Sequence, residues 1–174
     1  MTAKGYTAVG LAEVVAAAGV PKGSFYYYFK SKEEFGQALL ENYFSAYLSE
    51  VDGLLSGPGT AGERLLAYFQ NWTRHQGVDL PANRCLVVKL GAEVCDLSED
   101  MRLVLRQGTD AVIDRIAQCI AAGQAEGSIL NTTAAPELAA SLYQLWLGAS
   151  LLGKVGKHST PFDTARSTTQ QLLR

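Results

Sequence analysis

The chain has 174 residues and lacks the features that mark membrane-spanning and secreted proteins. Its most apolar stretch, AAPELAASLYQLWLGASLLG, is interrupted by Glu137 and Gln144, so we expect no membrane span. No basic segment followed by an apolar one opens the chain, which argues against a secretory signal and indicates a cytoplasmic protein. Three cysteines, an odd number without regular spacing, fit a reducing compartment rather than a disulfide framework.

The chain also lacks the residue patterns of enzymes and metal sites. It contains no Ser/His/Asp arrangement, no glycine-rich phosphate loop and no cluster of histidines and carboxylates. Cys85 and Cys95 are ten residues apart with no histidine at ligand spacing, which argues against zinc. We therefore expect neither catalysis nor a metal or other cofactor.

Strand-like alternation and internal repeats are both missing, and helical spacing of apolar residues runs through the chain instead. The sequence predicts an all-α fold. Gly19 and Pro21 separate the first two helices, and a capping box formed by Ser31 and Glu34 starts the third. Helices are expected over residues 7–18, 21–29, 32–55, 62–75, 85–94, 96–124, 136–155 and 161–174, with Thr7 as the first N-cap and loops over 57–62 and 77–83.

Positive charge is concentrated at the start of the chain, although the whole chain carries −2. Residues 1–32 contain four lysines and one glutamate, a net charge of 4 − 1 = +3, which leaves −5 for the rest. Two short helices with a tight turn, followed at once by a third helix, form a helix-turn-helix pattern over residues 7–34, which we call the reader. Phe25 and Phe29 share one helix face and should be buried, whereas three consecutive tyrosines cannot all point inward. This pattern indicates DNA binding.

The stretch AEVVAAAGVPKGSFYYYFKSKEEF resembles the DNA-binding domain of the TetR family of repressors. The resemblance implies a homodimeric, ligand-controlled repressor that binds a palindromic double-stranded DNA operator. It also implies a small helix-turn-helix DNA-binding domain over residues 1–45 and a larger helical regulatory and dimerisation domain over residues 46–174. Carried over position by position, the DNA contacts fall on Thr7, Lys22, Gly23, Ser24, Tyr26, Tyr27 and Lys32.

Members of that family have a full helix before the segment equivalent to residues 4–6, and Met1 stands where that helix should be ending. We expect this first helix to be missing from the chain. If nothing precedes Met1, the reader should be poorly packed and bind its operator weakly, because two short helices bury little surface without a third beneath them.

The segment around two of the cysteines is the second informative stretch. Cys95 immediately precedes Asp96-Leu-Ser-Glu99, a helix-start signal, and a thiolate is favoured at a helix N-terminus. A cysteine in an apolar helical body is otherwise more often structural. The run CLVVKLGAEVCDLSEDMR is similar to that of TetR-family repressors that sense N-ethylmaleimide, quinones, aldehydes and bleach. This resemblance implies Cys95 as a redox sensor with Lys154 as its partner; we expect Cys85 to be a secondary or resolving thiol and Cys119 to pack in the core.

The last two helices, over 136–155 and 161–174, are expected to form the homodimer interface. Their apolar stripe is broad, and such a stripe on a soluble monomer needs a partner to cover it. The stripe comprises Leu138, Leu142, Leu145, Trp146 and Leu152, with Gly148, Ala149 and Gly153 allowing close helix approach.

These resemblances imply a transcriptional repressor of detoxification genes that leaves its operator when an electrophile or oxidant modifies Cys95. Modification is expected to repack the helix beginning at Asp96 and to change the spacing of the two readers in the dimer. Two alternatives stay open. One is a repressor controlled by a reversible small-molecule ligand with inert cysteines, and the other is a helical dimerisation module that does not bind DNA.

Overall fold

The computed structural model describes residues 5–76 and 85–174. Every regular element in these ranges is an α-helix, which confirms the all-α prediction. The expected loop over 77–83 and the expected shortfall before residue 5 lie outside the described residues. In chain order the helices are α1 (Leu11–Ala17), α2 (Lys22–Tyr28), α3 (Lys32–Leu55), α4 (Ala61–Gln76), α5 (Leu86–Leu97), α6 (Glu99–Glu126), α7 (Ala135–Gly156) and α8 (Thr160–Leu172).

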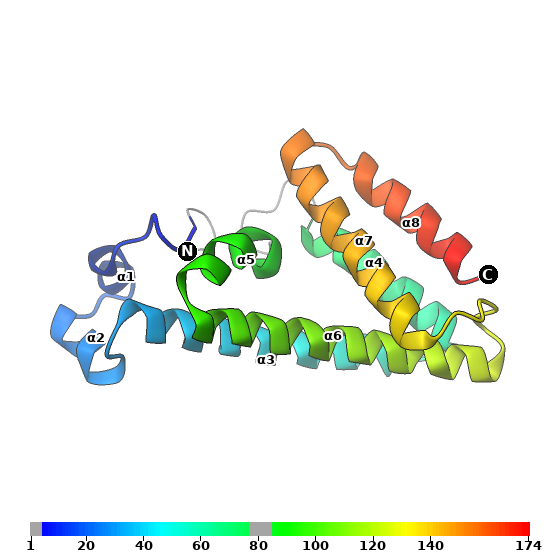
Figure 1. Cartoon of the computed structure of the whole chain (residues 1–174), viewed down its shortest axis with the longest axis horizontal. Coiled ribbons are helices and arrows are strands. Elements are labelled where there is room, and N and C mark those ends of the chain that lie inside the picture. Colours follow the sequence, from blue (N-terminus) through cyan, green and yellow to red (C-terminus); the bar gives the residue numbers. More distant parts are fainter. Residues whose placement is uncertain (1–4, 77–84) are drawn as a thin grey trace.

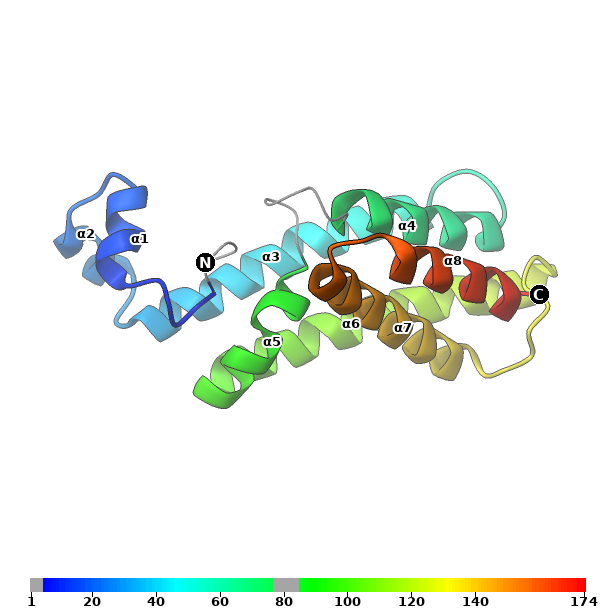
Figure 2. The same cartoon turned by 90° about the horizontal axis from the view of Figure 1, so that it is seen from above.

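Two long helices, α3 and α6, pack along each other and form the spine of the molecule (Figure 1). α1 and α2 lie at one end of this spine, and α4, α7 and α8 gather at the other (Figure 2). The short helix α5 packs on α6 between the two ends. The expected domain boundary at residues 45 and 46 falls inside α3, so one continuous helix joins the reader to the regulatory part.

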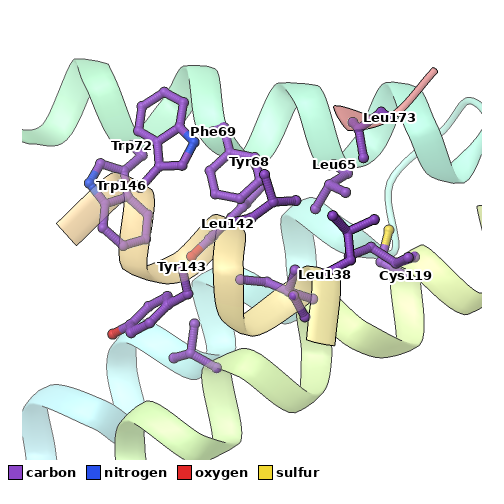
Figure 3. Close-up of a cluster of buried hydrophobic side chains, with 14 of the residues drawn as sticks. Leu65, Tyr68, Phe69, Trp72, Cys119, Leu138, Leu142, Tyr143, Trp146 and Leu173 are labelled. Carbon is purple, nitrogen blue, oxygen red and sulfur yellow. The ribbon is translucent and has the colours of Figure 1, made fainter. Parts of the chain in front are cut away.

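The larger apolar cluster holds the far end of the spine together, with side chains from α4, α6, α7 and α8 interdigitating (Figure 3). The rings of Phe69 and Trp146 stack at 4.9 Å between centroids. Both buried indole N–H groups have partners inside the protein: Trp72 donates to Ser150 Oγ and Trp146 donates to Thr169 Oγ1, each at 2.9 Å. Since a buried donor without a partner is costly, both tryptophans are satisfied core residues.

A second, smaller cluster lies nearer the reader and joins α3, α5 and α6. It also takes in Tyr6, which precedes the reader and is only 8% exposed. Its buried members are Tyr6, Leu40, Phe44, Leu86, Leu90, Val94, Met101 and Leu105. This smaller cluster packs α5 against α3 and α6, beside the segment that leads into the reader.

The first helix begins later than predicted. Gly10 is its N-cap and its carbonyl accepts the N–H of Val14, so Thr7 is not the N-cap. Residues 7 and 8 form a turn instead, with the buried side chains of Tyr6 and Val9 on either side. Gly19 takes the left-handed conformation expected after the helix, with φ of 66°.

The helix predicted over 96–124 begins at Glu99 rather than at Asp96. α5 continues through Asp96 to Leu97, and the N–H of Ser98 still donates to Val94. Ser98 then caps α6, because its Oγ accepts the N–H of Met101 at 3.3 Å. The sequence contains two overlapping cap signals, and the serine rather than the aspartate forms the cap.

The apolar stripe assigned to the dimer interface is mostly internal. Leu138, Leu142 and Trp146 are 3%, 0% and 0% exposed within the single chain, so they cannot form a surface for a partner. Large apolar side chains that do reach the surface on α7 are Leu151, Leu152 and Val155, all near its C-terminal end.

Candidate nucleic-acid interface and regulatory cysteines

An aromatic anchor fixes the second helix of the reader to the start of α3. Phe25 is buried at 5% exposure, and its ring centroid lies 5.4 Å from that of Phe29 and 5.7 Å from that of Phe35. Phe25 and Phe29 were predicted to share a buried face; Phe25 is fully buried and Phe29 is half-buried. Because the phenylalanines face inward, the opposite side of α2 faces solvent.

That outward side carries the tyrosines. Tyr26, Tyr27 and Tyr28 are 53%, 82% and 72% exposed, far more than is usual for such large side chains. Lys22 and Gly23 are also exposed, at the start of the helix, and an added Cβ at Gly23 would meet nothing within 4 Å. The surface of α2 is thus free to approach another molecule closely. Tyr28 was not among the predicted DNA contacts, although its exposure matches that of its neighbours.

The remaining predicted contacts divide into two groups. Ser24 is half-buried on α2. Thr7 and Lys32 lie at the base of the reader, where each is engaged within the chain: Thr7 N–H donates to Glu93 Oε1 at 2.6 Å, and Lys32 Nζ donates to the Tyr6 carbonyl at 2.7 Å. The Lys32 ammonium also lies 4.3 Å from the centre of the Tyr6 ring. Sequence reasoning missed Glu93, because nothing local marks a residue whose partners are more than eighty positions away.

Ser31 and Glu34 form the predicted start of α3. Ser31 Oγ accepts the N–H of Glu34 at 3.1 Å, and the Glu34 carboxylate accepts the N–H of Lys30. Side-chain acceptors thus satisfy backbone N–H groups at the helix start, which fixes the entry into α3 directly behind the reader.

Cys95 lies in the last turn of α5 and is exposed. Cys95 therefore does not lie at a helix N-terminus as predicted, and carbonyl groups rather than N–H groups are unpaired at this end of a helix. Its charged neighbour is Arg102 on α6. The pKa of Arg102 is raised first by its hydrogen bonds to the Glu99 carboxylate and to a smaller extent by the charge of Cys95.

Cys85 occupies the position that was expected for Cys95. It is the N-cap of α5, is only 6% exposed, and hydrogen-bonds with the hydroxyl of Tyr43. The same hydroxyl accepts the N–H of Leu86, the first residue of the helix. Burial, followed by the charge of Cys85, raises the pKa of Tyr43 well above its usual value, so this hydroxyl stays protonated. The start of α5 is therefore a polar site inside an apolar cluster.

Three further tyrosines lie within electrostatic range of this thiol. Cys85 acts electrostatically on Tyr47, Tyr68 and Tyr143, which come from α3, α4 and α7. The hydroxyls of Tyr47 and Tyr68 are 3.0 Å apart and hydrogen-bonded. Tyrosines of α3, α4 and α7 are thus close enough for the charge of Cys85 to act on their hydroxyls.

Lys154 lies in the last turn of α7 and is exposed. Both views place the beginning of α5, rather than its end, beside the C-terminal part of α7 (Figure 1, Figure 2). The fold therefore brings the Cys85 end of α5, and not the Cys95 end, towards the segment that carries Lys154. Cys119 is buried, with Sγ donating to the Ala61 carbonyl, and burial raises its pKa, as suits a packing residue.

A groove of about 310 Å³ opens between α4 and α8. Its walls combine the apolar edges of Phe69 and Trp146 with the polar groups of Glu63 and Arg166. Among the described helices, none combines the length and the hydropathy needed to cross a bilayer. Nor do three or more His, Cys, Asp or Glu side chains of those residues gather as metal ligands do.

Residues 61–169 match the family described as tetracyclin repressor-like, C-terminal domain, and residues 1–39 match the bacterial regulatory proteins of the tetR family. The chain belongs to the TetR family. Over 172 residues it is 41% identical to the HTH-type transcriptional repressor NemR of Escherichia coli strain K12, a match that covers 98% of this chain and 86% of NemR. It is 32% identical over 160 residues to the HTH-type transcriptional repressor DhaR of Mycobacterium sp. strain GP1, covering 92% of this chain and 79% of DhaR.

The fold is also similar to the crystal structure of the reduced form of E. coli NemR. The TM-score is 0.92 at 39% identity, over 97% of this chain and 88% of that one. Regulators of the TetR family bind DNA operators and are typically dimeric. This chain is a TetR-family transcriptional repressor related to NemR, in a family of regulators rather than enzymes.

Proposed function

We propose that this repressor leaves its operator when an electrophile or oxidant modifies a cysteine of α5, and that Cys85 is the thiol that matters most. The observation that carries the proposal is the place of Cys85 as the N-cap of α5, inside the protein and hydrogen-bonded to Tyr43. The resemblance to NemR, here in its reduced form, supports a redox or electrophile response.

DNA binding is assigned to the outward face of α2. A helix of this size fits the major groove, where its first residues reach base edges and neighbouring hydroxyls hold phosphates. Lys22, Gly23 and Ser24 begin the helix, and Tyr26 and Tyr27 follow on its exposed surface. Thr7 and Lys32 lie at the base of the reader, where hydrogen bonds to Glu93 and to the Tyr6 carbonyl fix their positions, and we propose them as contacts to the phosphate backbone.

Cys85 lies at the end of α5 that favours a thiolate, whereas its burial slows access by a reagent. N–H groups at the start of a helix favour a thiolate, whereas the carbonyl end disfavours one. The ammonium of Lys154, on the neighbouring part of α7, is proposed to assist the thiolate and to approach the modified sulfur. Cys95 becomes the secondary thiol: it is exposed and reacts without disturbing packed side chains.

The chemical step with N-ethylmaleimide is an addition. The thiolate sulfur forms a bond to one alkene carbon of the maleimide, the carbon–carbon double bond becomes single, and water supplies the proton to the other carbon. The adduct adds a bulky group between α5 and Tyr43 of α3. Since the interior is closely packed, α5 and α3 must move apart, and α3 carries the reader at its start.

The functional unit is proposed to be a homodimer formed through α7 and α8, which places two readers on a palindromic operator. The surface that supports this is the group Leu151, Leu152 and Val155, which are 50%, 59% and 72% exposed. Burial against the same residues of a partner would remove them from water.

The test uses Cys85→Ser and Cys95→Ser variants of the full chain, with a DNA fragment taken from upstream of its own gene. Fluorescence anisotropy measures operator affinity before and after N-ethylmaleimide, and intact-protein mass spectrometry locates the adduct. Cys85→Ser is expected to bind DNA but to resist release, whereas Cys95→Ser is expected to be released as the wild type is. If Cys85→Ser is released at the reagent concentration that releases the wild type, the assignment of Cys85 is refuted. If Cys95→Ser is the variant that resists release, Cys95 is the sensor.

The α4–α8 groove favours one second candidate, a reversible small-molecule inducer with inert cysteines. Its mixture of aromatic edges and opposite charges suits an amphipathic molecule. The two candidates separate in a variant with all three cysteines replaced by serine. Release of that variant by a cell extract, lost again on dialysis, supports the reversible inducer.

A further inference from the structure

A single carboxylate joins the regulatory domain to the base of the reader. Glu93, near the end of α5, accepts the N–H of Tyr6 at 3.0 Å with Oε2 and the N–H of Thr7 at 2.6 Å with Oε1. Its two oxygens therefore hold two consecutive backbone amides. The residues are 87 and 86 positions apart in sequence, so this contact depends on the folded arrangement of both parts.

The same backbone is also held by α3. Lys32 Nζ donates to the Tyr6 carbonyl at 2.7 Å and lies over the Tyr6 ring. Gly5, the residue before Tyr6, has a φ of 95°, which favours glycine. A Cβ at this position would lie only 3.1 Å from Glu93 Oε2, so glycine allows the backbone to approach the carboxylate closely. We call Glu93, Tyr6, Thr7 and Lys32 the Glu93 joint.

The carboxylate is charged under ordinary conditions. Hydrogen bonds from Thr7, through its side chain and its backbone, lower the pKa of Glu93, and those from Tyr6 and the nearby Lys32 charge act in the same direction. A charged acceptor forms stronger hydrogen bonds with N–H groups than a neutral one does. The amides of Tyr6 and Thr7 thus donate to a charged acceptor.

We propose that Glu93 couples the state of α5 to the position of the reader. α5 has only twelve residues, with Cys85 as its N-cap and Glu93 in its last turns, so a shift or tilt at one end moves the carboxylate at the other. The amides of Tyr6 and Thr7 follow, and with them the turn that leads into α1. This inference rests on the proposed function for its inducer, but the joint itself depends only on the repressor binding DNA.

Coupling between two sites is reciprocal, so the joint is tested from both ends. The full chain carries Glu93→Ala, Glu93→Gln or, as a matched control, Asp96→Ala, which removes an exposed carboxylate from the same helix. In the first arm, operator affinity is measured with and without N-ethylmaleimide. In the second, hydrogen exchange of α5 is followed by mass spectrometry with and without operator DNA.

In the first arm, the wild type and Asp96→Ala are expected to lose roughly 10-fold or more in operator affinity on alkylation, within the usual range of allosteric coupling. For Glu93→Ala, the operator affinities before and after alkylation should agree within about twofold when the same fraction of protein carries the adduct. Glu93→Gln, which keeps one acceptor oxygen and the side-chain size, should lie between them. If alkylation lowers the operator affinity of Glu93→Ala by the same factor as that of the wild type, the proposal is overturned.

In the second arm, operator DNA is expected to slow exchange in α5 of the wild type and of Asp96→Ala, but not of Glu93→Ala. An unchanged α5 in the wild type, or an equal response in Glu93→Ala, rejects the joint. If N-ethylmaleimide fails to release the wild type, the cysteine proposal falls, and this arm alone decides the role of Glu93. Circular dichroism confirms that each variant is folded, and Glu93→Gln replaces Glu93→Ala in both arms if the latter is not.

Discussion

Gly36 in α3 has no room for a side chain, and replacing it with alanine should loosen the base of the reader. An added Cβ would lie 2.7 Å from Met101 Sδ and 2.8 Å from Cε2 of Tyr6. Both distances are much shorter than ordinary van der Waals contact. Met101 can yield cheaply because its side chain is flexible, but Tyr6 is fixed by its backbone hydrogen bonds to Glu93 and Lys32.

The size of the effect follows from two opposing contributions. Alanine in a helix interior is favoured over glycine by about 1 kcal/mol, whereas over-packing a filled site costs about 1–3 kcal/mol. Gly53 provides the matched control, because it lies in the same helix and an added Cβ meets nothing within 4 Å. Gly53→Ala should therefore show the helix gain alone, and the difference between the two variants should measure the over-packing.

Thermal unfolding by circular dichroism, at one fixed protein concentration, tests this expectation. Gly53→Ala should raise Tm by about 2–4 °C, the shift that about 1 kcal/mol produces in a protein of this size. Gly36→Ala should leave Tm unchanged or lower it by a few degrees, and hydrogen exchange at Tyr6 should accelerate. If Gly36→Ala raises Tm as much as Gly53→Ala does, Tyr6 is not held rigidly and the reasoning fails.

Three further expectations follow from named contacts. Ser31→Ala removes the acceptor for the Glu34 N–H and should lower the free energy of unfolding by about 1 kcal/mol in urea, while Ser31→Thr should largely retain it. Tyr43→Phe leaves the Leu86 N–H and the Cys85 thiol without their buried partner; it should cost about 1–3 kcal/mol and change the alkylation rate of Cys85, and an unchanged rate would contradict the contact. The folded protein lowers the pKa of Glu93, so the charged carboxylate stabilises the fold fully above the unfolded pKa of about 4.5. This stabilisation is lost as pH falls through the pKa of the folded state. Between pH 6 and roughly pH 3, Glu93→Gln should therefore lose less free energy of unfolding than the wild type, as measured by urea unfolding at each pH.

Local signals were sufficient for α2 and for the start of α3, whereas the predicted start of the first helix at Thr7 was wrong. The start of α3 at Lys32 follows from Ser31 and Glu34, whose hydrogen bond needs only three residues of separation. Gly19 takes its left-handed conformation because few other residues can end a helix that way. The outward tyrosines follow from the inward phenylalanines, since one helix face cannot hold both. These features depend on neighbours in sequence, which is why sequence reasoning finds them.

Features that depend on distant partners could not be predicted. Asp96 and Ser98 both begin plausible caps, and only the packing of α5 against α6 selects Ser98, which moves Cys95 from the start of a helix to the end of one. The stripe on α7 looked like an interface because a sequence does not show which apolar face the same chain already covers. The contacts of Glu93 with Tyr6 and Thr7 leave no trace in local sequence at all.

Burial of the proposed sensor thiol slows its reaction but increases the free energy by which an adduct perturbs the surrounding packing. Cys85 is 6% exposed, so a reagent reaches it only when the surrounding side chains open. Once formed, an adduct there occupies space among Tyr43 and its neighbours, and over-packing of that kind costs about 1–3 kcal/mol. This matches the 1–3 kcal/mol by which an effector usually shifts a regulatory equilibrium. An adduct on exposed Cys95 extends into solvent and over-packs no neighbouring side chain. We therefore expect Cys95 to be labelled rapidly while the operator complex stays intact.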